Sequence, residues 1–137
     1  MWYLYFASVG LEFKWSSFKK AKKMRIAKKR SLCPVACTLD IIGDKWTLLV
    51  IRDLLLGRSR FREFAASPEK IATNILSDRL TRLSEHGLVE RYPSPDTPGR
   101  NAYRLTKKGK SLGEIVKSMV EWGTKNIDGT EARLKPK

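Results

Sequence analysis

The sequence predicts a mainly α-helical domain that carries one small β-hairpin. Apolar residues recur at helical spacing in five segments between residues 34 and 126. Two short segments with strand-forming residues, 89–92 and 102–105, flank a turn-rich stretch that contains three prolines. A chain of 137 residues suffices for one small core. We therefore expect a single domain at 31–127, between an N-terminal extension, 1–30, and a C-terminal tail, 128–137.

The N-terminal half of the domain predicts three helices. Pro34 suits the first position of a helix that ends at Gly43, and Asp44 can cap the next helix. The second helix is apolar on nearly every side until Gly57, so it must be central to the fold. A short third helix follows over 60–66.

Residues 73–88 predict a helix of about thirteen residues that has two different faces. Thr73 can cap its N-terminus, and Gly87 suits the left-handed conformation that closes a helix. The stripe toward the core is apolar: Leu76, Leu80 and Leu83. The opposite face carries hydrogen-bonding side chains of little bulk, with Arg79 on the flank: Asn74, Ser77, Asp78, Thr81, Arg82 and Glu85. Such a helix can enter a DNA major groove, although a solvated face would have a similar composition.

A hairpin with a long, rigid tip follows this helix. Arginines line its arms and its tip: Arg91, Arg100 and Arg104. Two helices joined by a short turn and followed by a basic hairpin are the ingredients of a winged helix-turn-helix. In this arrangement the hairpin is the wing, which can reach phosphates or a minor groove.

The last predicted helix, over 106–126, has an apolar stripe, although the preceding helices already supply enough apolar residues for a core. The stripe contains Leu112, Ile115, Val116, Met119 and Trp122. With Leu39 and Ile42 of the first helix, it predicts the interface of a homodimer. The alternative is that the stripe packs on its own domain.

The net charge of +14 indicates a polyanionic partner, either nucleic acid or an anionic membrane surface. Residues 1–30 contain nine Lys or Arg and one acidic residue, so more than half of the excess lies in the extension. Its apolar part is too short to span a bilayer, and its charges follow the apolar run instead of preceding it as in a secretory signal. Three interpretations stay open: an upstream start choice with Met24 as the true start, a basic arm on DNA, or a segment on a membrane surface.

The composition gives little support for an enzyme. Two cysteines form no disulfide framework, one histidine cannot build a usual zinc site, and no phosphate-binding glycine loop is present. We expect no catalytic residue, no cofactor, no metal, no membrane partner and a reducing, cytoplasmic setting. The alternatives to DNA binding are a protein-interaction adaptor and a basic RNA-binding module. Common RNA modules expose aromatic residues on a sheet, whereas the aromatic residues here follow inward stripes.

Three segments resemble the HxlR family of bacterial winged-helix transcriptional regulators. They are CPVACTLDIIGDKWTLLVIRDLLLGRSRFREF, IATNILSDRLTRLSEHGLVERY and PGRNAYRLTKKGKSL, and the resemblance covers residues 33–127. It implies a homodimer joined by the first and last helices, with each 73–88 helix in a major groove of double-stranded DNA and each wing alongside. It also implies repression or activation of a nearby operon. Of these two roles we expect repression, through binding to a roughly palindromic operator.

The residues expected at the DNA come from the 73–88 helix and the wing: Thr73, Asn74, Ser77, Arg79, Arg82, Arg91, Arg100 and Arg104. Asp78 would repel phosphates, so we expect it to pair with Arg82 one turn further along the helix.

Cys33 is the candidate redox-sensing residue. It stands at the start of the first helix after Lys28, Lys29 and Arg30, a setting in which a thiol is expected to be reactive. Some members of the family that the chain resembles sense oxidants or electrophiles through a cysteine at this position. The alternative is a small buried residue of the dimer interface. An oxidant or a small-molecule effector is therefore left open as a further partner.

Overall fold

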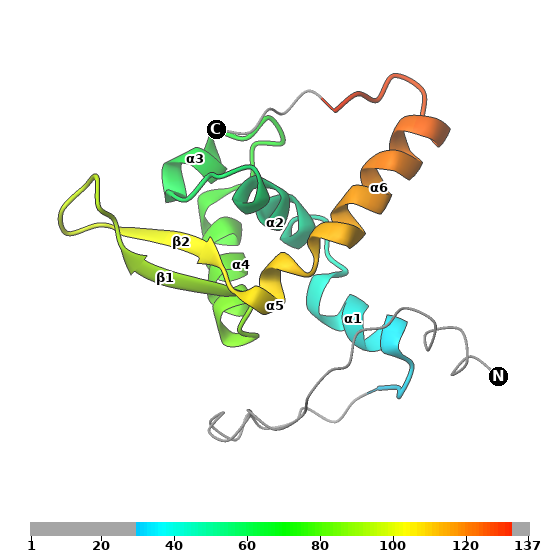
Figure 1. Ribbon diagram of the computed structural model, residues 1–137, viewed down its shortest axis with the longest axis horizontal. Helices are drawn as coiled ribbons and strands as arrows, with labels where there is room; N and C mark the ends of the chain where they lie inside the picture. The colour runs from blue at the N-terminus through cyan, green and yellow to red at the C-terminus, as the bar shows by residue number, and fades with distance from the viewer. Residues whose placement is uncertain (1–29, 133–137) are drawn as a thin grey trace. The chain divides into compact units, whose positions relative to one another are not determined.

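The computed structural model describes residues 30–132 (Figure 1). The elements in this range are α1 (Pro34–Ile42), α2 (Thr47–Leu55), α3 (Phe61–Ala65), α4 (Thr73–Glu85), β1 (Val89–Pro93), β2 (Asn101–Leu105), α5 (Lys107–Lys110) and α6 (Gly113–Asn126). This arrangement confirms the predicted fold class of helices with one hairpin. The predicted extension lies outside the described residues except for Arg30, and the tail is described only to residue 132.

The core lies between α2 and α4. Ile51 of α2 is fully buried, and Phe64 of α3 closes the core from another side. The predicted stripe of α4, formed by Leu76, Leu80 and Leu83, is at most 2 % exposed. Burying a leucine side chain contributes roughly 1.5–3 kcal/mol. Packing of the leucines therefore fixes which face of α4 remains outside.

The predicted cap of α2 by Asp44 differs in position, because Trp46 occupies the N-cap and Asp44 stands two residues earlier. Asp44 nevertheless binds the residues that lead into the helix. Its Oδ1 accepts hydrogen bonds from the amides of Trp46 (2.9 Å) and Thr47 (3.1 Å), and its Oδ2 accepts one from the Thr47 hydroxyl. The preceding Gly43 is required by space, because a Cβ there would come within 2.3 Å of the Leu39 carbonyl oxygen. The connection between α1 and α2 is therefore tight on both sides of Asp44.

The predicted cap of α4 by Thr73 is wrong. Ala72 occupies the N-cap position, without a side-chain hydrogen bond, and Thr73 is the first helical residue. The adjacent Ile71 is only 8 % exposed, so packing sets the start of the helix. The predicted end is confirmed, because Gly87 has a φ of +66°.

The hairpin is antiparallel, with Val89 opposite Leu105 and Pro93 opposite Asn101. A contact that the sequence did not predict joins it to the segment before α3. The Tyr103 amide donates to the Ser59 carbonyl (2.8 Å), next to an isolated bridge between Arg60 and Ala102. The base of the wing is thereby fastened to the helix-turn-helix.

The single helix predicted over 106–126 is wrong, because the chain turns between α5 and α6. Gly109 of α5 packs so closely that a Cβ would lie 2.0 Å from the Leu88 carbonyl oxygen. The Thr106 hydroxyl accepts from the Gly109 amide and donates to the Gly87 carbonyl. These contacts fasten α5 to the junction of α4 and β1, so the chain changes direction before α6.

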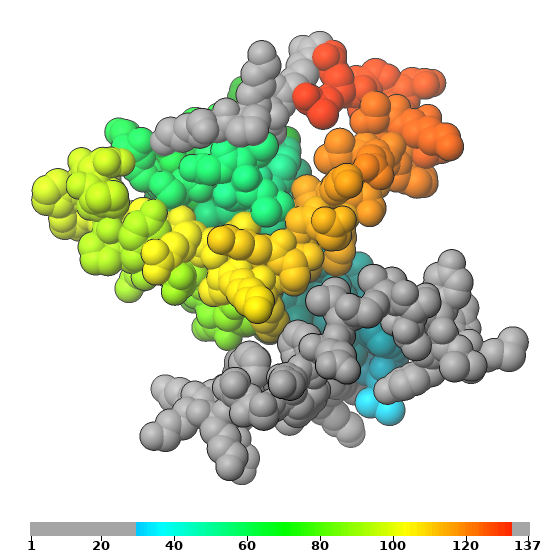
Figure 2. Space-filling model, viewed as in Figure 1, coloured from blue at the N-terminus to red at the C-terminus, as the bar shows by residue number. Residues whose placement is uncertain are grey.

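The hairpin and α6 extend on different sides of the helical core (Figure 1). Figure 2 shows α6, in orange, standing out from the rest of the domain. None of its residues is fully buried, although Val116 packs against the core. Among the described residues, no helix has the length and apolar character needed to cross a membrane.

Candidate nucleic-acid interface

The outward face of α4 presents small polar side chains. Thr73, Asn74 and Ser77 are all exposed, opposite the buried leucines. Further along, the Thr81 hydroxyl donates to the Ser77 carbonyl at 3.0 Å. The first turns of α4 therefore offer the hydroxyl and amide groups that can hydrogen-bond to base edges.

Arg79 lies between α4 and the start of α2, which differs from its expected role at the DNA. Its side chain is 18 % exposed, and its Nε is 3.4 Å from Oδ1 of Asp44. Its Nη1 is 3.6 Å from Oδ2 of Asp78. Both nitrogens are buried and donate no hydrogen bond to another described residue. Arg79 therefore points into the contact between the two helices.

The expected ion pair between Asp78 and Arg82 is not formed in the described part of the chain. Asp78 instead faces Arg79, which Asp44 holds on that side of the helix. The side chain of Arg82 is partly buried, at the C-terminal end of α4.

The wing carries three exposed arginines, one of which is paired. Arg91 and Arg100 are exposed. The Nε of Arg104 lies 2.6 Å from Oε1 of Glu90, and its guanidinium lies over the Tyr92 ring, 5.0 Å from the ring centre. Arg91 and Arg100 therefore carry more of the wing's uncompensated charge than Arg104 does.

Other cations near these elements were not among the predicted site residues. Lys45 is exposed beside Asp44, and its Nζ lies 5.0 Å from the Trp46 ring centre. On α5, Lys107 and Lys110 are exposed, and the Lys108 Nζ donates to the His86 carbonyl (2.8 Å). The run of lysines after Thr106 was a signal in the sequence, but its closeness to the end of α4 depends on the fold.

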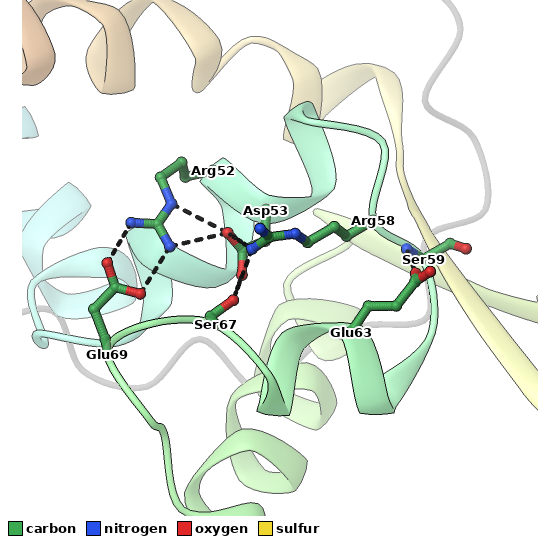
Figure 3. Close-up of polar contacts among 7 residues, drawn as sticks. All are labelled: Arg52, Asp53, Arg58, Ser59, Glu63, Ser67 and Glu69. Carbon is green, nitrogen blue, oxygen red and sulfur yellow. Dashed lines mark hydrogen bonds and ion pairs between the residues drawn. The ribbon is translucent and has the colours of Figure 1, made fainter. Parts of the chain in front are cut away.

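A network of charged side chains joins α2 to the turn that enters α4 (Figure 3). The Arg52 guanidinium donates to both carboxylate oxygens of Glu69, at 2.7 and 3.0 Å. The buried Asp53 pairs with Arg52 (2.9 Å) and Arg58 (2.8 Å) and accepts a hydrogen bond from the Ser67 hydroxyl. Hydrogen bonding by Arg52 lowers the pKa of Glu69 below its ordinary value, despite partial burial.

Cys33 is exposed at the N-cap of α1, and its amide donates to the Ser31 hydroxyl at 3.0 Å. Cys37, one turn further, is partly buried, and its Sγ donates to the Ser31 carbonyl at 3.3 Å. The basic neighbours Lys28 and Lys29 lie outside the described residues. Within the described domain, Cys33 is therefore open to a reagent or to another chain.

The residues predicted at a dimer interface divide into two groups. Ile42 is 5 % exposed and belongs to the domain core, so its assignment to a dimer interface is wrong. Leu112 and Val116 pack against the same core. The exposed members are Leu39, Ile115, Met119 and Trp122, and the sequence prediction missed Leu32, Val35 and Val120, which are also exposed. The exposed group lies on α6 and on or just before α1.

The comparisons with known proteins agree with this geometry. Residues 41–131 match the family described as HxlR-like helix-turn-helix. The chain belongs to this family. The HTH-type transcriptional regulator YvaP of Bacillus subtilis (strain 168) is 38% identical over 98 residues, which cover 71% of this chain and 91% of YvaP.

Two solved structures of regulators, both in a reduced form, share the fold. The reduced form of the redox regulator HypR is 36% identical, with a TM-score of 0.64 over 70% of this chain and 95% of HypR. The reduced form of the transcriptional regulator YodB from B. subtilis is 29% identical, with a TM-score of 0.59 over 74% of this chain and all of YodB (100%). The family match and these relatives identify the chain as a DNA-binding transcriptional regulator.

Proposed function

We propose that the chain is a homodimeric repressor that binds a roughly palindromic operator in the cytoplasm. The observation that carries the proposal is the polar outward face of α4, which is backed by a fully buried leucine stripe and accompanied by a wing with exposed arginines. In this arrangement Thr73, Asn74 and Ser77 meet base edges in the major groove. Arg91 and Arg100 meet backbone phosphates, which position the protein without reading sequence.

The homodimer is supported by apolar side chains that the described domain leaves uncovered. Met119 and Trp122 of α6 are 55% and 63% exposed, and Leu39 of α1 is 52% exposed. Met119 also lines an apolar groove of about 730 Å³ between α2 and α6, together with Leu55 and Val116. Covering large apolar side chains contributes roughly 25 cal/mol for each Å² removed from water, which favours association through α1 and α6.

A response to oxidants is proposed for Cys33. The thiol is exposed at the start of α1, the helix assigned here to the dimer interface. A covalent change at Cys33 would alter the contact between subunits and therefore the spacing of the two α4 helices. The relative HypR, a redox regulator by its name, shares this fold, which supports such a response.

Selection of duplexes from a random DNA library with the full chain tests the proposal. We expect one enriched sequence with two inverted half-sites whose centres lie about 34 Å, or one helical turn, apart. The same sequence should be protected in footprints upstream of the chain's own gene. No enrichment, or tighter binding to RNA than to any duplex, would contradict the proposal and favour the RNA-binding alternative. A stable monomer in light scattering at micromolar concentration would contradict the proposed homodimer.

A further inference from the structure

Two ion pairs connect α4 to opposite ends of α2. Asp44, just before the start of α2, faces Arg79 in the middle of α4. Arg52, in the last turn of α2, holds Glu69 in the turn that enters α4. Helix α4 therefore has one charged attachment along its length and a second at its entry.

The entry turn is held in a conformation that its sequence does not favour. Lys70 has a φ of +53°, a left-handed conformation that L-residues other than glycine rarely adopt. It directly follows Glu69, whose two oxygens receive the planar fork of Arg52. The hydrogen bond from the Ser67 hydroxyl to Asp53 fastens the other end of the same turn. Three side-chain hydrogen bonds, two between Arg52 and Glu69 and one between Ser67 and Asp53, thus keep the turn in place against α2 (Figure 3).

The attachment at Arg79 is electrostatic. The Asp44 carboxylate already accepts hydrogen bonds from Trp46 and Thr47, so Arg79 contributes charge without a well-formed hydrogen bond. Burial raises the pKa of Asp44, but these hydrogen bonds and the charge of Arg79 lower it below its ordinary value. The aspartate is therefore ionised at neutral pH and attracts Arg79.

None of the four charged groups is suited to contact DNA. Asp44 and Glu69 are acidic and would repel phosphates. The Nε and Nη1 of Arg79 are buried, and Arg52 is occupied by Glu69 and Asp53. The leucine stripe keeps α4 on the core, and the two ion pairs add restraints on its rotation. The bidentate Arg52–Glu69 pair is the more directional of the two.

We propose that the Asp44–Arg79 and Arg52–Glu69 pairs are positioning contacts that set the orientation of α4, and so govern discrimination between DNA sequences without touching DNA. The inference rests on the proposed role of α4 in the major groove. Base readout needs hydrogen bonds of defined geometry, whereas phosphate contacts tolerate small shifts. Loosening either pair should therefore reduce specific binding more than non-specific binding.

The test uses Arg79→Gln and Glu69→Gln in the full chain, with one duplex selected from a random library by the wild type and one scrambled duplex. Affinity for the selected duplex should fall about tenfold, the equivalent of one lost base contact, while affinity for the scrambled duplex stays within about twofold. The slope of log affinity against log salt should not change. A control at an exposed position outside the helices, Asp128→Asn, should leave all three quantities unchanged.

Three results would overturn the inference. A salt slope reduced by about one per subunit in Arg79→Gln would make Arg79 a phosphate contact. Equal losses on both duplexes, or no loss on the selected one, would remove the positioning role. If Arg79→Gln fails to unfold cooperatively, Arg79→Lys replaces it, because this variant keeps the charge but shortens the reach to Asp44, and a loss of discrimination is again expected. Failure of the wild type to enrich any duplex would instead refute the proposed function itself.

Discussion

Arg100→Ala at the tip of the wing should weaken DNA binding without changing the preferred sequence. Arg100 is exposed and forms no ion pair within residues 30–132, so its charge is available to a phosphate. Each phosphate contact contributes about 0.9 to the slope of log affinity against log salt, so two subunits should lose about 1.8. Between 50 and 200 mM salt, the wild type should therefore lose roughly twelvefold more affinity than the variant.

Fluorescence anisotropy with a labelled selected duplex over a salt series measures this slope. Arg104→Ala is the matched control, because Glu90 and Tyr92 already engage the Arg104 guanidinium. Its slope should change less than that of Arg100→Ala. An unchanged slope in Arg100→Ala, or an altered base preference, would refute the assignment of the wing tip to the phosphate backbone.

Three further predictions concern stability and regulation. Leu80→Ala should lower the free energy of unfolding by about 2–5 kcal/mol in urea titrations, because Leu80 is 2% exposed, whereas the exposed neighbour variant Thr81→Ala should change it far less. A mild thiol oxidant should weaken operator binding by the wild type but not by Cys33→Ser. Equal responses of the two proteins would indicate that Cys33 has only a structural role. Folding lowers the pKa of Glu69, so the ionised carboxylate stabilises the fold above its ordinary pKa of 4.5, and this stabilisation is lost as the pH falls further. Glu69→Gln should therefore make the free energy of unfolding depend less steeply on pH in the acid range. Parallel pH curves for the wild type and the variant would contradict this.

Local patterns predicted α4 well because its signals lie within the helix. The spacing of Leu76, Leu80 and Leu83 identified the buried face, and Gly87 identified the end. The start was less predictable, since burial of Ile71 outweighed the capping preference of Thr73. Propensity therefore gave the extent of α4, while packing decided its first residue.

The errors share a different cause, which is contact between residues distant in sequence. Arg79 has a flanking position on its helix, and only its closeness to Asp44, 35 residues earlier, places it away from the proposed DNA-binding face. Ile42 shares a helical face with Leu39, but the core covers one and leaves the other exposed. The break before α6 depends on how closely Gly109 approaches Leu88. A one-dimensional pattern contains none of these distances.

Entry of α4 into the major groove is tested most directly by changing one groove of the selected duplex at a time. Replacing purine N7 with carbon in both half-sites removes a major-groove acceptor and leaves base pairing intact. Contact through the α4 face of Asn74 and Ser77 predicts a loss of affinity of about tenfold or more. Replacing guanine with inosine removes a minor-groove donor and should change affinity by no more than about twofold. A large loss with inosine and none with the N7 substitution would contradict the placement of α4 in the major groove.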